Sequence, residues 1–283
     1  MSSVRPLYCF SHVQKAAGTS VDVVMRRHFG IGHMLVNPAI GWTYKPRDLA
    51  ADLRLNPLTR SISSHWLRPF VDFGAWNERM IWYTFLRDPI ARVLSHYQYH
   101  VERMGVTKSL QNWILDEEQN WQTRFLAGAP DLDAAKRILT TRYAMVGLTE
   151  RFDESFVMLR ALLGIDNLCL WYGHPRNVAA SRERRERIHR EFETFRDLVL
   201  ELNQLDIELY AFAVREIYPR QVAAFGGEQQ LKSRTQEAKL EGRDRVASLR
   251  EMSFLAYRRA FHLPVQHIRT GLARIRNEPD ERY

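Results

Sequence analysis

The stretch Leu7–Ser20, LYCFSHVQKAAGTS, decides the fold that we expect for this chain. It begins with an apolar run of strand length, continues through a loop of small residues, and ends in hydroxyl residues typical of a helix start. The N–H groups of such a turn and helix point to one spot, where the helix dipole also favours an anion. Lys15 adds a positive charge, and we expect the hydroxyls of Thr19 and Ser20 to cap the helix. The stretch therefore predicts a phosphate-type loop.

The order of residues in this loop separates it from the common nucleotide triphosphate loop. Lys15 precedes Gly18, whereas the lysine of a Walker-type loop follows the glycine. A nucleotide-dependent, kinase-like phosphotransferase would share the architecture but would need that order and a magnesium-binding carboxylate. It therefore stays as an alternative.

A second motif, RDPIARVLS, follows the apolar run Met80–Leu86, which has the length and composition of a strand. Arg87 stands where this strand ends, Asp88 is the expected cap of a helix, and Pro89 suits the first turn of that helix. Ser95 follows two turns later. Because ligands of open α/β sheets lie outside the carboxyl ends of the strands, both motifs are expected to form one site. Arg87 and Ser95 can hold a second phosphate there.

Together the motifs resemble those of the membrane/carbohydrate type of sulfotransferases, which use 3′-phosphoadenosine-5′-phosphosulfate (PAPS). The resemblance is to the heparan sulfate 2-O- and 6-O-sulfotransferases and their bacterial relatives (sulfotransferase family 2). Segment 12–20 aligns with the family's His-Ile-Pro-Lys-Thr-Gly-Gly-Thr-Ser, and segment 87–97 with Arg-Asp-Pro-x-x-Arg-x-x-Ser-x-Tyr. The resemblance implies an α/β fold with a P-loop-like three-layer core, a central, mainly parallel sheet and flanking helices. It also implies PAPS as the donor and a hydroxyl acceptor, most readily a sugar or glycoconjugate.

The resemblance assigns donor contacts to individual residues. Ala17 stands where the family often has glycine, and its Cβ limits how closely the loop can approach a ligand. Asn177 falls in a segment that the family uses to close over the nucleotide. The implied contacts are Lys15, Ala17, Gly18, Thr19 and Ser20 for the phosphosulfate, Arg87 and Ser95 for the 3′-phosphate, and Asn177 for the nucleotide.

A third segment, SSHWLRPFVDFG, resembles the family segment that carries the catalytic histidine, which here is His65. The resemblance implies that His65 accepts the proton of the acceptor hydroxyl, a role that suits histidine near neutral pH. Lys15 is the second expected catalytic residue, because it can stabilise the charge on the leaving nucleotide. Weaker candidates for acceptor contacts are Trp66, His100, Trp121 and Gln122. A peptide tyrosine or a small metabolite stays open as the acceptor, as does a non-catalytic scaffold.

Composition argues against other classes of function. The net charge of +8 comes from scattered basic residues, and the dense cluster 182–190 interleaves arginine with glutamate, as a solvated helix does. No nucleic-acid fold signature is present, so we expect no nucleic-acid partner. His96 and His100 are spaced for one helix face, but they lack the His-Glu-x-x-His pattern of a zinc site. We expect no metal.

The chain organisation predicts an α/β domain over residues 1–220 and a helical extension over 221–283. Gly226-Gly227 marks the break, after which Glu228–Phe261 reads as one long polar helix that Pro264 ends or kinks. The mixed charge of this extension favours packing or a homodimer over a membrane surface.

Two further expectations concern the cellular compartment. No apolar run approaches the ~20 residues of a transmembrane segment, and no secretory leader is visible, so a cytoplasmic enzyme is expected. Cys9 and Cys169 lie in apolar surroundings, and both are expected to be reduced and buried.

Overall fold

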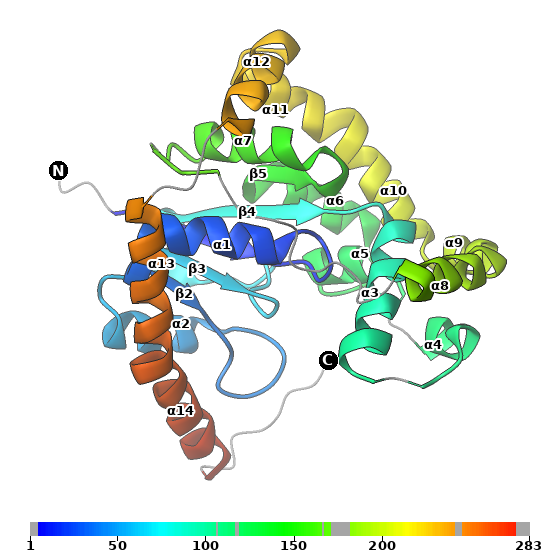
Figure 1. Ribbon diagram of the computed structural model, residues 1–283. Helices are drawn as coiled ribbons and strands as arrows, with labels where there is room; N and C mark the ends of the chain where they lie inside the picture. The colour runs from blue at the N-terminus through cyan, green and yellow to red at the C-terminus, as the bar shows by residue number, and fades with distance from the viewer. Residues whose placement is uncertain are drawn as a thin grey trace.

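The computed structural model describes residues 5–105, 107–116, 119–165, 167–170, 182–240 and 245–275. Five strands form one sheet in the order β2-β3-β1-β4-β5, and every neighbouring pair is parallel (Figure 1). The α/β class with a parallel central sheet, predicted from the sequence, is thereby confirmed. The strands are β1 (Leu7–Ser11), β2 (His33–Leu35), β3 (Ser61–Ser64), β4 (Met80–Leu86) and β5 (Tyr143–Leu148).

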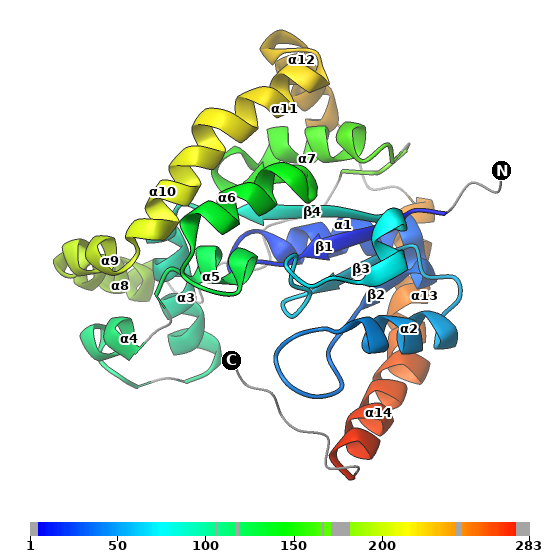
Figure 2. The ribbon, with the colours of Figure 1, turned by 180° about the vertical axis from the view of Figure 1, so that it is seen from behind.

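Helices cover both faces of the sheet, which is why nearly every strand residue is buried, including the serines of β3. Helix α1 (Gly18–Phe29) lies on one face, and α2 (Pro46–Leu55), α5 (Trp121–Ala127) and α6 (Leu132–Thr141) lie on the other (Figures 1 and 2). The other helices are α3 (Pro89–Arg103), α4 (Leu110–Asp116), α7 (Phe152–Leu162), α8 (Arg182–Thr194), α9 (Arg196–Leu202), α10 (Gln204–Phe212), α11 (Tyr218–Phe225), α12 (Glu228–Lys239), α13 (Arg245–Tyr257) and α14 (Leu263–Ile275). Short 3₁₀ turns span Gly30–Gly32, Gly74–Arg79 and Thr149–Arg151, and π-helical turns span Ala213–Ile217 and Arg258–His262.

Aromatic side chains of the central strands form the middle of the core. Phe10 of β1 stacks on Tyr83 of β4 at 5.1 Å between ring centroids and meets Phe85 edge-on at 6.4 Å. Gly147 of β5 makes room for this arrangement, because a Cβ at Gly147 would lie 2.5 Å from the Phe85 ring. The packing fixes β1 beside β4 and so fixes the loops that follow them.

A second, smaller core lies beyond the carboxyl ends of the strands. It joins α3, α4, α8 and α9, which gather on the side to which the β4 arrow points in Figure 1. Its buried residues are Val93, Tyr97, Leu110, Trp113, Ile114, Ile188, Phe192 and Val199. This layer of helices positions α3 against the loop after β1.

The C-terminal helices differ in part from the sequence prediction. The expected boundary at residue 220 falls inside α11, and the long helix expected over Glu228–Phe261 divides into α12 and α13, with residues 241–244 outside the description, while α14 follows it. Pro264 does not end the helix. A π-helical turn precedes α14, and such a turn shifts the hydrogen-bond ladder enough to accommodate a missing N–H.

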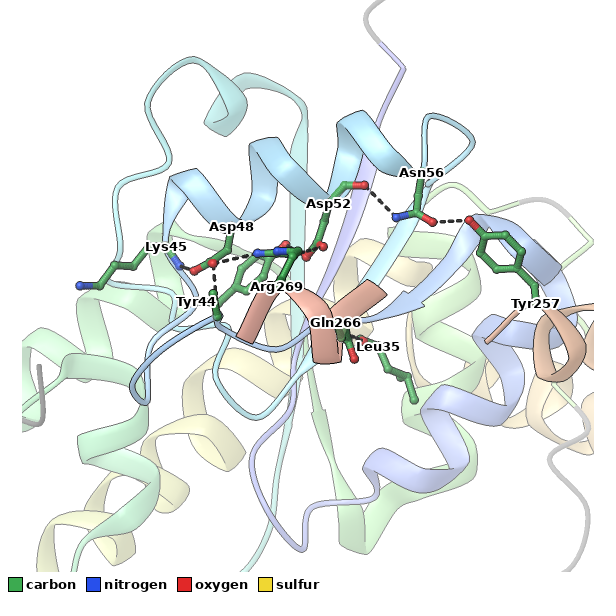
Figure 3. Close-up of polar contacts among 10 residues, drawn as sticks. Leu35, Tyr44, Lys45, Asp48, Asp52, Asn56, Tyr257, Gln266 and Arg269 are labelled. Atoms are coloured by element: carbon green, nitrogen blue, oxygen red, sulfur yellow. Dashed lines mark hydrogen bonds and ion pairs between the residues drawn. The ribbon is translucent and has the colours of Figure 1, made fainter. Parts of the chain in front are cut away.

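These helices pack on the α/β core. The guanidinium of Arg269 on α14 bonds two buried carboxylates of α2, Asp48 (Nη2 to Oδ1, 2.9 Å) and Asp52 (Figure 3). Gln266 donates to the Leu35 carbonyl at 3.0 Å. Other links are Tyr257 to Asn56, and Glu251 to Arg26 and Arg27 of α1. The extension is therefore tied to α1, α2 and β2.

Two remaining expectations concern the cysteines and the membrane. Cys9 is buried as predicted, but Cys169 is only half-buried, and both are free thiols. Within the described ranges, no helix has both the length and the apolar character that a membrane crossing requires.

Candidate anion-binding and proton-transfer site

The loop after β1 has an unusual backbone. Lys15 and Ala17 have φ angles of 66° and 63°, a left-handed region that residues with a Cβ seldom adopt. Between them, the Ala16 N–H bonds the Val13 carbonyl at 3.2 Å. Alternation of left- and right-handed residues forms a concave turn with N–H groups inside, which is an anion-binding geometry. The predicted phosphate-type loop thus has an appropriate backbone.

The expected capping of α1 by hydroxyl side chains is wrong. The helix begins at Gly18 after the left-handed Ala17, and no side chain caps it. Ser20 N and Val21 N instead bond the Ala17 carbonyl at 3.0 and 3.3 Å. Thr19 and Ser20 therefore lie inside the first turn, where the N–H groups of Gly18 and Thr19 have no partner within the helix.

Gly18 is required by a neighbouring ring. A Cβ at Gly18 would lie 1.6 Å from Nε2 of His12, the residue that directly follows β1. Burial, with the charges of His65 and Lys15, holds the pKa of His12 well below its ordinary 6.5. His12 was not among the residues predicted for the site, although its place at the head of the first motif could have indicated it.

His65 directly follows β3, at the strand end predicted for it, and lies against His12. The two ring centroids are 3.9 Å apart, and His65 Nδ1 lies 2.9 Å from the His12 carbonyl. Because a carbonyl oxygen only accepts, Nδ1 carries the proton and Nε2 has the lone pair. Burial is the main cause that lowers the pKa of His65 below 6.5; the hydrogen bond to the His12 carbonyl opposes it, and the charges of Arg68, His96 and Lys15 act with it. His65 is therefore a neutral proton acceptor near pH 7.

Arg87 connects the two predicted motifs. Its Nη1 donates to the Lys15 carbonyl at 3.0 Å, so the end of β4 is tied to the loop after β1. The chain leaves these adjacent strands in opposite directions, toward β2 and toward β5, which makes this a topological switch point of the sheet. Arg87 Nε is buried and has no hydrogen-bond partner. The arginine thus holds the loop with one nitrogen and keeps another donor uncommitted.

Lys15 and Arg87 place two positive charges together. Burial is the first cause that lowers the pKa of Lys15 to about 8, Arg87 is the second, and Glu102 acts in the opposite direction. Lys15 Nζ lies 4.4 Å from the centroid of the Tyr99 ring on α3. Ser95 stands one turn before Tyr99 and so shares its helix face. Lys15 and Arg87 therefore form one electropositive point, and Ser95 lies on the face of α3 that carries Tyr99 to it.

Gln122 has a different place from the one expected. It was predicted as an acceptor contact, but it is fully buried, and its amide binds the Arg87 backbone at both ends. The Arg87 N–H donates to Oε1 at 3.0 Å, and Nε2 donates to the Arg87 carbonyl at 2.9 Å. Asp206 of α10 in turn caps α5 by accepting from Gln122 N at 3.0 Å and Thr123 N at 2.8 Å. Gln122 is a positioning residue for Arg87.

The tryptophans predicted as acceptor contacts do lie near His65. Trp66 follows it directly, and Arg68 places its guanidinium carbon 5.9 Å from the Trp66 ring centroid and 5.4 Å from that of Trp121. Trp42, an exposed residue, meets Trp66 edge-on at 4.6 Å. Sequence reasoning missed Arg68, because nothing in its local sequence shows that it packs among aromatic rings.

The other predicted residues contribute less. His100 accepts a hydrogen bond from Trp113 Nε1 at 3.0 Å and so faces the α3–α4 contact. Asn177 lies outside the described residues. Over the part of the chain that the structure describes, no group of three or more His, Cys, Asp or Glu residues could hold a metal ion.

A comparison of the chain with models of known protein families gives no match, and a comparison with curated proteins gives none either. The fold and the site define an α/β protein with a partly buried, positively charged loop at the switch point of its sheet and a neutral histidine beside it. The functional argument therefore depends on these residues.

Proposed function

We propose that this chain is an enzyme, a PAPS-dependent sulfotransferase that moves the sulfuryl group from PAPS to a hydroxyl of a carbohydrate or glycoconjugate. The observation that carries the proposal is the hydrogen bond between Arg87 and the Lys15 carbonyl. It brings the two motifs that resemble the donor site together at the one point of the sheet where a ligand is expected. A neutral His65 beside them supplies the base that such a transfer needs.

The donor site divides into two anion subsites. The N–H groups of Gly18 and Thr19, with Lys15 and Ser20, would hold the 5′-phosphosulfate at the start of α1. The uncommitted Nε of Arg87 and the Ser95 hydroxyl would hold the 3′-phosphate. A pair of neighbouring cations in a partly buried site fits such a ligand, because an anion between them offsets their repulsion. When bound, PAPS supplies the activated sulfuryl group.

The transfer step assigns one task to each catalytic residue. His65 Nε2 takes the proton of the acceptor hydroxyl while the hydroxyl oxygen bonds to the sulfuryl sulfur. The bond from that sulfur to the bridging phosphate oxygen breaks, and Lys15 stabilises the negative charge that this oxygen gains. The product nucleotide, 3′-phosphoadenosine-5′-phosphate, leaves with that electron pair. We expect the reaction to need no metal ion, since Lys15 and Arg87 supply the positive charge.

The acceptor side favours a ring-shaped substrate. Trp66 and Trp121 flank Arg68 next to His65, and indole faces commonly stack on apolar faces of sugars. A buried Trp121 Nε1 with no hydrogen-bond partner adds an available donor on this side. A tyrosine peptide or a small metabolite would use the same donor chemistry and belongs in the same assay.

The test is a transfer assay with PAPS and a panel of glycosides, tyrosine peptides and simple phenols, read by mass spectrometry. We expect a sulfated product from at least one acceptor, and a fall of about 10²–10⁴-fold for His65→Gln. The control is His267→Gln, because His267 is an exposed histidine of α14, and it should retain full activity. Phosphoryl transfer from ATP to the same acceptors would replace this proposal with the kinase-like alternative.

A further inference from the structure

Helices α13 and α14 have an apolar stripe on the side that does not pack on the core. Their packing sides carry buried residues such as Phe254 on α13 and Ala273 on α14. Opposite these, apolar residues recur at intervals of three and four, which places them on one face of each helix. Val246, Leu249, Met252, Ile268, Leu272 and Ile275 are each at least 50% exposed.

Such a stripe needs an explanation. Single exposed apolar residues are common on protein surfaces, but contiguous apolar patches with a polar rim mark contact sites. Here the stripe continues from α13 onto α14, and both views of the fold show these helices along the outer side of the molecule (Figures 1 and 2). A stripe of this kind has the character that contact surfaces show.

The charges around the stripe are nearly all positive. The segment 245–275 contains six arginines and one acidic residue. That residue, Glu251, faces the core and accepts from Arg27 Nε at 2.7 Å. Arg245, Arg250 and Arg259 are exposed. Within the segment, the carboxylate therefore faces the core, three arginines are exposed, and Arg269 is bonded to Asp48 and Asp52 of α2.

The apolar stripe and the exposed arginines together distinguish between a second copy of the chain and a lipid bilayer as the partner of this surface. In a symmetric dimer the same patch faces itself, so each copy would bring its exposed arginines toward a positively charged surface of the other. An anionic lipid surface instead attracts the arginines, while its acyl boundary takes up the apolar side chains. We propose that the outer face of α13–α14 docks the protein on anionic phospholipid bilayers. The proposal is independent of the sulfotransferase activity.

The test is flotation of the full chain with vesicles of phosphatidylcholine alone or with added phosphatidylglycerol. We expect the protein to float with the anionic vesicles and to lose binding as salt is raised. The double variant Leu249→Ser/Met252→Ser should lower the partition constant about tenfold or more, because two apolar side chains no longer enter the interface. Arg245→Ser/Arg250→Ser should lower it about fivefold or more per arginine.

The matched control is Leu115→Ser/Arg215→Ser, which removes one exposed leucine and one exposed arginine far from α13 and α14 in sequence, and it should float like the wild type. Equal melting temperatures show that the variants fold. The proposal is overturned if the wild type floats with neither vesicle, or if the α13 variants float as well as the control. It is also overturned if light scattering shows a dimer that Leu249→Ser/Met252→Ser dissociates, since a second copy then covers the stripe.

Discussion

At the scale of single residues, the anion loop is costly to the ligand-free protein. Lys15 and Ala17 adopt left-handed backbone conformations, and Lys15 and Arg87 bring like charges together in partly buried positions. Strain of this kind persists where the surrounding structure enforces it, and it is frequent at functional sites. A bound anion, as proposed for this loop, would offset both costs.

The pH dependence of donor binding and transfer follows from two of these residues. Lys15, whose pKa is about 8, loses its charge above that pH, and His65 gains a proton only at a pH below 6.5. We expect kcat/KM for the donor to be high between these limits and to fall on both sides. The variant Lys15→Arg should move the alkaline limb upward without moving the acid limb. An alkaline limb that does not respond to Lys15→Arg would contradict the assigned role of Lys15.

The lowered pKa of Lys15 also predicts how the stability of the ligand-free protein depends on pH. Its pKa is about 8 in the folded chain and 10.5 as an ordinary lysine, so the unfolded chain binds more protons between these values. Stability therefore rises with pH across this window. Lys15→Met should raise the urea midpoint at neutral pH and flatten that rise, because the buried charge is gone. A lower midpoint for this variant would show that the charge is not a cost.

At the scale of elements, the sequence was informative about strands and less so about contacts between elements. The apolar run predicted as a strand matches β4, and Asp88 caps α3 by accepting from Ala91 N at 2.9 Å, as expected. The start of α1 was wrong because the left-handed turn at Ala17 replaces a side-chain cap. A left-handed φ angle can be expected from the sequence where glycine stands, but not where alanine stands, as it does at position 17.

The residues that the sequence did not place correctly depend on contacts between segments far apart in the chain. The separation of Gln122 from Arg87 gives no sign that one amide binds both backbone groups of the arginine. In the same way, His12 and Arg68 acquire their places only when β1, β3 and α5 pack together. Motif residues could be predicted, whereas the residues that position them could not.

Gln122 offers a sharp test at this scale. Gln122→Leu keeps the volume but leaves the Arg87 N–H and carbonyl buried without partners, at a cost of about 1–3 kcal/mol each. We expect lower stability in urea and weaker binding of the product nucleotide, because Arg87 is no longer held in place. The control is Gln221→Leu, since Gln221 makes the same pair of bonds to Val146, at 2.7 and 2.8 Å, on β5. It should lose similar stability and keep nucleotide affinity. Equal affinity losses in both variants would contradict a positioning role for Gln122.

At the scale of the whole molecule, the last helices close the fold over its first half. Residues more than 200 positions apart meet where Arg269 of α14 bonds Asp48 and Asp52 of α2 (Figure 3). Asp48 also accepts from Lys45 N at 3.0 Å and so fixes the chain segment that carries Trp42. The C-terminal extension, which the sequence left undecided among packing, dimerisation and membrane contact, packs on the core, and its α14 holds α2 through Arg269.

Removing this brace should be costly. Arg269→Ala leaves two buried carboxylates without their cation, and we expect a loss of about 3 kcal/mol in the free energy of unfolding. Because burial already raises the pKa of Asp52 to about 6, the loss should shrink as pH falls toward 5 and the carboxylate protonates. Urea titrations at several pH values measure both effects. A loss that does not depend on pH would show that packing, and not charge, accounts for the contact.

The central claim, that the site holds a nucleotide with a 3′-phosphate, is tested most directly by calorimetry. The account predicts that 3′-phosphoadenosine-5′-phosphate binds without added magnesium, that AMP, which lacks only the 3′-phosphate, binds far more weakly, and that Arg87→Gln removes most of this difference. Arg54→Gln, at the exposed last turn of α2 away from the carboxyl ends of the strands, should change nothing. Equal affinity for the two nucleotides, a preference for ATP with magnesium, or no nucleotide binding would contradict the account.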